Sequence, residues 1–223
     1  MQTFATTAPV TAVLDIPAGV IRIVAADQAE ATVEVRPADP GKSRDVKAAE
    51  QTEVGYADGV LRVEVPEAKS RVLGNGGFID VTVKVPAGSR VEAKAAAGEF
   101  RSTGPLGDVA FEGQQGTVEL DEVVGARLVL QAGDVSVARL GGSAEISTQK
   151  GDIQVAEAVR GTVTLRTEAG GITVGAARGV SAALDAGTAH GRIHNSLQNS
   201  GGGAAELTVH ATTAFGDITA RSL

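Results

Sequence analysis

The stretch GDVSVARLGGSAEISTQKGDIQVAEAV, residues 133–159, contains one pattern twice. A Gly-Asp pair followed by a hydrophobic residue, a polar residue, Val and Ala begins at Gly133 and begins again at Gly151. In both directions, a glycine with a hydrophobic residue two positions later recurs, seven times in all. The glycines are Gly98, Gly116, Gly133, Gly151, Gly170, Gly191 and Gly216, and the hydrophobic residues are Phe100, Val118, Val135, Ile153, Ile172, Ile193 and Ile218. Self-similarity of this kind is the signature of a repeat architecture.

Each repeat reads as short β-strands. Alternation places Val135 and Val137 on one face and Asp134 and Ser136 on the other, the period of two that a strand requires. A second glycine lies in the middle of most repeats, so glycines interrupt the pattern before three helical turns could form.

Repeats that cannot bury their own apolar face must stack. Stacking places Val118, Val135, Ile153 and Ile172 above one another inside a coil, with strands about 4.8 Å apart. The corner glycines adopt positive φ at little cost. The Asp residues after them, Asp134, Asp152 and Asp217, are expected to bond their own turn backbone. We therefore predict an all-β fold, a parallel β-solenoid (β-helix-like) of about 18-residue coils over residues 86–223. An antiparallel sandwich is the competing fold, but it does not require the aligned repeat.

Residues 1–85 have longer strands and longer loops, and we expect them to form an N-terminal β-strand region that opens and caps the solenoid. Residues 42–51, KSRDVKAAEQ, fit a short helix or a loop equally well. Residues 195–203, NSLQNSGGG, are expected to form a flexible excursion near the other end.

Composition excludes several classes of function. The chain has 223 residues and a net charge of −7, and it has no run of Lys and Arg, which opposes nucleic-acid binding. It has no cysteine, and therefore no disulfide, thiolate metal site or cysteine nucleophile. The first residues lack the basic segment and apolar run that are typical of a signal peptide, and no apolar run approaches about 20 residues. The expectation is a cytoplasmic protein, with an exported or surface-exposed domain as the alternative.

The pattern resembles a known family, the bacterial β-strand-repeat proteins called "putative adhesins". The stretches that carry the resemblance are TAVLDIPAGVIRIVAAD (11–27), VTVKVPAGSRVEAKAAAGEFRS (81–102), and the repeated GDVSV, GDIQV, GGITV and GDITA. The resemblance covers nearly the whole chain. It implies a structural-repeat fold, and the family offers neither an assigned biochemical function nor catalytic residues.

Candidate metal ligands are few. His190 and His194 are four positions apart, and on one strand they would lie about 13 Å from each other, too far to share an ion. His210 could approach either through stacking. The Gly-Asp turns supply one carboxylate per coil, fewer than calcium-binding β-rolls use. We predict no metal site and no cofactor.

A carbohydrate-active β-helix enzyme would need convergent carboxylates and aromatic platforms. The outward residues Glu112, Glu119 and Glu145 are scattered, and Tyr56 is the only tyrosine in a chain without tryptophan. We therefore predict a protein that is not an enzyme and has no catalytic residues.

The sequence favours a structural or protein-interaction β-solenoid. A surface adhesin or glycan-binding module is the alternative, and a carbohydrate-active enzyme comes third. The last strand, Gly216 to Ala220, is expected to form an open edge, so the partner is another protein or a second copy bound through the C-terminal coil. A monomer or a dimer closed through that coil is expected, because the N-terminal region, 1–85, would cover the other end.

Overall fold

The computed structural model describes residues 1–66, 77–199 and 205–223. They form two compact units, Met1–Gln114 and Gln115–Leu223. The first unit contains β1 (Gln2–Ala5), β2 (Thr11–Asp15), β3 (Ala18–Ala26), β4 (Glu30–Pro37), α1 (Ser43–Gln51), β5 (Glu53–Ala57), β6 (Val60–Glu64), β7 (Ile79–Pro86) and β8 (Arg90–Thr103). β9 (Pro105–Ala132) begins in the first unit and ends in the second. The second unit continues with β10 (Val135–Leu140), β11 (Ala144–Lys150), β12 (Ile153–Ala158), β13 (Gly161–Ala169), β14 (Ile172–Ala176), β15 (Ala182–His190), β16 (Ile193–Ser196), β17 (Leu207–Phe215) and β18 (Ile218–Ser222).

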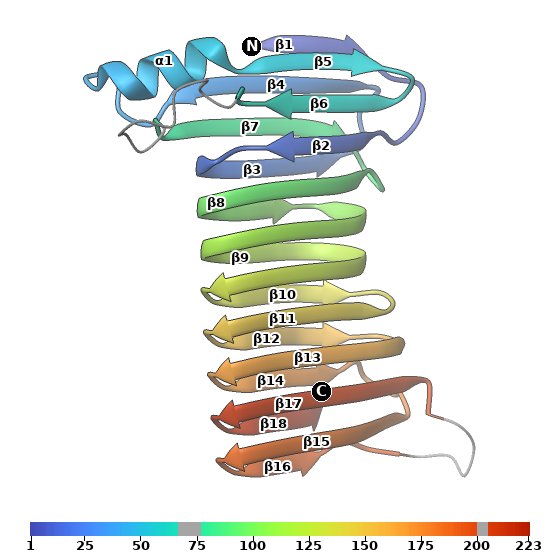
Figure 1. Cartoon of the computed structure of the whole chain (residues 1–223). Helices are drawn as coiled ribbons and strands as arrows, with labels where there is room; N and C mark the ends of the chain where they lie inside the picture. The colour runs from blue at the N-terminus through green and yellow to red at the C-terminus, as the bar shows by residue number, and fades with distance from the viewer. Residues whose placement is uncertain (67–76, 200–204) are drawn as a thin grey trace. The chain divides into compact units, whose positions relative to one another are not determined.

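In the first unit, parallel strands form the centre and antiparallel strands form the outside. β2 lies between β6 and β8, and β3 lies between β7 and β8, all in parallel (Figure 1). Antiparallel partners follow on the outer side: β5 pairs with β6, β4 with β7, and β1 with β4. Whether the division between positions 85 and 86 marks a cap and a solenoid stays a prediction.

Residues 42–51, for which a helix and a loop were equally expected, form α1 from Ser43 onward. Asp45 in its first turn is only 2% exposed. Its carboxylate accepts a 3.0 Å hydrogen bond from the backbone N–H of Phe78, just before β7. This hydrogen bond links α1 to the chain segment just before β7 in the same unit.

The second unit stacks two rows of parallel strands. We call two successive strands joined through a corner glycine, such as β11 and β12 at Gly151, a coil. One row follows the order β9, β10, β12, β14, β18, β16, and the other follows β9, β11, β13, β17, β15. The predicted all-β class with parallel strand stacking is therefore confirmed.

An apolar ladder runs through the first of these rows. Ile153 pairs with Val135 on one side and with Ile172 on the other, as the repeat predicts. All three side chains are at most 1% exposed. Burying an aliphatic side chain of this size contributes about 1.5–3 kcal/mol, so the ladder is a principal source of stability.

Close stacking explains the corner glycines. Gly133 has a φ of 143°, and a Cβ there would lie 1.5 Å from the carbonyl oxygen of Gly116 in the neighbouring coil. At Gly151 the corresponding distance, to the carbonyl oxygen of Gly133, is 2.2 Å. No side chain fits at such a distance, so the coils approach one another only where the corner residue is glycine.

The prediction that residues 216–220 form an open edge is wrong. β18 is an inner strand, in which Ile218 pairs with Ile172 on one side and with Ile193 on the other. Figure 1 shows β17 and β18 between the β13–β14 pair and the β15–β16 pair, although they come last in the chain. The repeat specifies a shape that any coil can stack upon, and the spacing of glycines does not specify the stacking order.

The expected excursion at residues 195–203 is only partly described. Asn195 and Ser196 belong to β16, and residues 200–203 lie outside the described residues.

Candidate interaction surface

The Asp residues of the Gly-Asp corners link one coil to the next. Asp134 Oδ1 accepts a hydrogen bond of 2.8 Å from the backbone N–H of Asp152, and Asp152 Oδ1 accepts one of 2.7 Å from Gly171. Asp217 does the same with the N–H of Arg192, at 2.8 Å. The expectation that each Asp bonds its own turn is therefore corrected, because the N–H groups of a stacked coil lie one strand spacing away. These carboxylates have a structural role.

A row of threonines inside the second unit was missed by the sequence analysis. Thr148, Thr167, Thr213 and Thr188 are consecutive partners across β11, β13, β17 and β15. Each hydroxyl donates to a corner glycine carbonyl, at 3.3 Å for Thr148 to Gly133 and 3.0 Å for Thr167 to Gly151, Thr213 to Gly170 and Thr188 to Gly216. The available signal was a Thr three positions before Gly151, Gly170, Gly191 and Gly216.

The three histidines lie on three different strands. His210 of β17 has its Nδ1 3.3 Å from Asp185 Oδ2 of β15. His190 stacks on Phe215, with ring centroids 4.8 Å apart. His194 lies on β16, so it does not share a strand with His190, which ends β15. Within residues 1–66, 77–199 and 205–223, no group of three or more His, Cys, Asp or Glu residues could hold a metal ion.

The three carboxylates considered for a carbohydrate enzyme each lie beside different residues. Glu112 lies 3.3 Å from Lys94 Nζ, in an exposed ion pair. Glu145 on β11 is in register with Arg127 on one side and Thr164 on the other. Glu119 is exposed on β9 and has a polar partner of its own.

Tyr56 contacts Phe4, with ring centroids 5.5 Å apart. The tyrosine therefore has an aromatic neighbour within its own unit.

Two shallow depressions of the second unit lie over β11, β13, β17 and β15. The larger, of about 610 Å³, is lined by Val129, Leu130, Ser147, Thr148, Gln149, Arg166, Thr167, Glu168, Ala189, Thr212, Thr213 and Ala214. The second, of about 480 Å³, shares Arg166 and Thr212 with it and adds Asp185 and His210. Small-molecule sites are usually enclosed and largely apolar. The two depressions are open to solvent, so they lack the enclosed shape of such a site.

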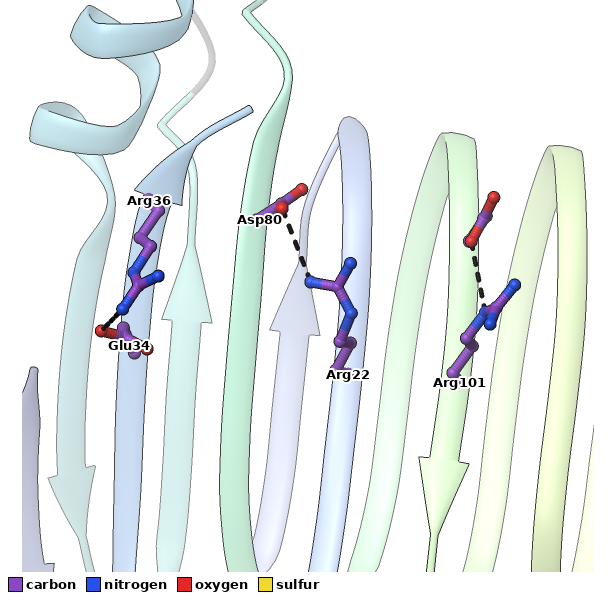
Figure 2. A network of polar contacts seen from close by, with 6 residues as sticks. Arg22, Glu34, Arg36, Asp80 and Arg101 are labelled. Carbon is purple, nitrogen blue, oxygen red and sulfur yellow. Dashed lines mark hydrogen bonds and ion pairs between the residues drawn. The ribbon is translucent and has the colours of Figure 1, made fainter. Parts of the chain in front are cut away.

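In the first unit, exposed charged side chains form three separate ion pairs (Figure 2). Arg22 on β3 lies 3.5 Å from Asp80 on β7, while Arg36 pairs with Glu34 along β4 at 2.7 Å. Arg101 pairs with Glu99 along β8 at 3.3 Å. Exposed pairs of this kind contribute about 0–1 kcal/mol each, so they add little to stability and leave this surface polar.

The end of the stack in the second unit is formed by β15 and β16. Within the described residues, β15 pairs only with β17, and β16 pairs only with β18. Ile193 of β16 is 46% exposed, whereas its partner Ile218 one coil further in is 0% exposed. The apolar ladder therefore ends at an uncovered coil, and we call β15 and β16 the end coil.

In the part of the chain that the structure describes, no helix has the length and apolar character needed to span a membrane.

The comparisons with known proteins identify related folds. A family model described as Toastrack DUF4097 matches residues 14–222. A crystal structure of a "putative adhesin" from Bacteroides fragilis aligns with 98% of this chain and 95% of its own, at 13% identity and a TM-score of 0.59. One from Parabacteroides distasonis, also named "putative adhesin", aligns over 100% and 95% at 15% identity, with a TM-score of 0.48. A "putative cell adhesion protein" from Clostridium sporogenes aligns over 100% and 98% at 13% identity, with a TM-score of 0.39. The first likeness shows a shared fold, and the other two have TM-scores too low to support an argument. No curated protein matches the sequence significantly.

Proposed function

Since the chain belongs to the Toastrack DUF4097 family, we propose that it is a non-enzymatic structural or protein-interaction β-solenoid. Its stacked coils would hold flat outer faces rigid, and the N-terminal region, 1–85, would cap one end. The partner is another polypeptide that lies along an outer face or at the end coil.

The observation that carries this proposal is how the repeated polar residues are used. Inward threonines and corner aspartates are bonded to backbone groups of neighbouring coils. These residues support the stack, and the outward rows are the surface that is left for contact with a partner. A rigid scaffold that presents side chains from many strands suits recognition of a partner, because little ordering is needed on binding.

Site-specific photo-crosslinking in the producing cell tests this role. A photoreactive amino acid is placed at Gln154 on the outer side of β12, or at Arg166 on the opposite row, both of which are exposed. We expect discrete adducts with a polypeptide from one face and not from the other. Absence of adducts from both faces, together with turnover of a small molecule by the purified protein, would refute the proposal.

Surface adhesion is the second candidate. It is favoured by the fold shared with the Bacteroides fragilis protein named "putative adhesin". An adhesin would act outside the cell, whereas a cytoplasmic location was expected from the sequence, so fractionation of the producing cell separates the two. Binding of the purified chain to a glycan array or to whole cells would support adhesion.

A further inference from the structure

We propose that two copies of this chain join end to end through the end coil, so that β15 and β16 of one copy pair in antiparallel fashion with β15 and β16 of the other. The inference rests on the proposed interaction role and names the partner as a second copy of the chain.

On the side away from β17, β15 has no strand partner among the residues that the structure describes. The carbonyl of Ser181 accepts a hydrogen bond from the N–H of Leu207 at the start of β17, whereas the N–H of Ala182 is directed away from β17, to the carbonyl of Gln198. Backbone groups of successive residues in a strand point to opposite sides. The register with β17 is continuous from Ala182 to Thr188. Leu184, Ala186 and Thr188 therefore direct their N–H and C=O groups toward the open edge.

The backbone of β16 has the same arrangement. The carbonyl of Arg192 accepts a hydrogen bond from the N–H of Ile218, on the inner side. By the same alternation, Ile193 and Asn195 direct their backbone groups outward along the stack. The end coil thus offers two rows of donors and acceptors.

Apolar side chains accompany these rows. Leu184 and Ala186 are half-buried, although their partners in β17, Val209 and Ala211, are at most 1% exposed. Ile193 is 46% exposed at the end of the aliphatic ladder. Covering these side chains would continue the core of the unit by one more layer, which favours association.

Devices that usually protect an edge strand are absent from the two strands. Edges are commonly blocked by Lys, Pro or an inward-pointing charge. β15 reads AALDAGTAH and β16 reads IHNS, without Lys, Arg or Pro. The acidic residue, Asp185, is in register with His210 on the outward row, so its charge does not cover the edge.

The shape of the edge selects a second copy as the occupant. An extended peptide could pair with β15 or with β16, but would leave the other strand and the apolar interior between them open. Another end coil presents the same two strands at the same separation. A two-fold axis that crosses both strands brings β15 against β15 and β16 against β16, which is the closed, isologous contact of a dimer. In the first unit, β6 and β7 have antiparallel partners in β5 and β4, so the described strands there offer no matching coil for a filament.

The mass of the protein in solution tests the proposal. Sedimentation equilibrium from about 1 to 100 µM covers the affinities typical of specific dimers. We expect the native chain to reach twice its mass of 22.4 kDa. Ile193→Lys places a charge at the edge, and Ala186→Pro removes an N–H that faces outward, so both variants should remain monomeric with unchanged circular dichroism. The matched control is Val124→Lys, which alters an aliphatic side chain on β9 that is more exposed (59%) than Ile193, and it should still dimerise.

Cysteine scanning locates the contact, because the chain has no cysteine of its own. Single cysteines at Asp185, Ala186, Gly187 and Thr188 are oxidised in turn, with Gln154→Cys on β12 as the control. In an antiparallel two-fold pair, the residue at the axis faces its own copy at about 4.5–5.5 Å between Cβ atoms. We expect disulfide-linked dimers to peak at one β15 position and to be absent at Gln154→Cys.

Three outcomes would overturn the proposal: a native chain that stays monomeric at about 100 µM, a dimer that survives both edge variants, or β15 cysteines that link no faster than the control. A monomeric chain whose outer face still crosslinks to another polypeptide would retain the proposed interaction role while refuting the end-to-end dimer. If the native chain is monomeric and Ile193→Lys abolishes its crosslinking to another protein, the edge binds that protein and the end-to-end dimer is refuted.

Discussion

Asp134 and Asp152 are joined between successive coils, because Asp134 Oδ1 accepts a 2.8 Å hydrogen bond from the backbone N–H of Asp152. Asp152 repeats the contact with Gly171, at 2.7 Å. A carboxylate that accepts from a backbone N–H makes a charge-assisted bond, stronger than a bond between neutral groups. The Gly-Asp motif therefore combines a glycine that permits close stacking with an acceptor that links the stacked layers.

Replacing Asp152 tests this link. Asp152→Asn keeps an oxygen acceptor and should lower the free energy of unfolding by less than about 1 kcal/mol. Asp152→Ala removes the acceptor, and we expect a larger loss, of about 1–2 kcal/mol, limited by the access of water to the exposed N–H of Gly171. Urea denaturation of the two variants measures the difference. Equal losses would show that the carboxylate does not link the coils.

The apolar ladder predicts a large effect at Ile153. Ile153→Asp would bury an unpaired charge between Val135 and Ile172 and should lower the free energy of unfolding by more than about 3 kcal/mol. The neighbouring Gln154→Asp places the same charge on the exposed side of β12, where the expected change is within about 0.5 kcal/mol. Denaturant unfolding of both variants provides the comparison, and similar small losses from the two would contradict the ladder.

The threonine row predicts a hydrogen-bond effect without a change of shape. Thr167→Val keeps the volume of a side chain that is 5% exposed but removes its 3.0 Å bond to the carbonyl of Gly151. We expect a loss of about 1–2 kcal/mol, because that carbonyl loses a partner. Thr212→Val, on the exposed side of β17, should change stability by less than about 0.5 kcal/mol. Thermal unfolding of the two variants measures the difference. If Thr167→Val leaves the stability unchanged, the threonine row does not stabilise the stack through these hydrogen bonds.

Added calcium or zinc should leave the thermal stability of the protein unchanged. Each corner carboxylate oxygen described above is already used by a backbone N–H, and the histidines are separated on β15, β16 and β17. We expect sub-millimolar calcium or zinc to raise the melting temperature by less than about 3 °C, since a ligand that binds the folded state must stabilise it. A larger rise that disappears on replacing His190, His194 or Asp134 would reveal a site.

Some features follow from local sequence because they depend on neighbours along the chain. Alternation around Val135 and Ile153 sets which side chains point inward, and the corner glycines set where one strand ends and the next begins. The helix at Ser43–Gln51 could not be chosen from its residues alone, because the contact that fastens it joins Asp45 to the distant Phe78. The outward bonds of Asp134 and Asp152 were missed for the same reason, since their partners belong to another coil.

The repeat pattern alone predicts the all-β class, the parallel pairing of the repeats and the residues of the inner ladder. The stacking order cannot be read from that pattern: in the folded chain, β18 lies between β14 and β16, and the end coil is left at the edge. The physical reason is that every coil presents nearly the same ladder to its neighbour. Periodicity therefore specifies that Ile172 stacks on an equivalent isoleucine, and the path of the chain after β14 decides whether that residue is Ile193 or Ile218.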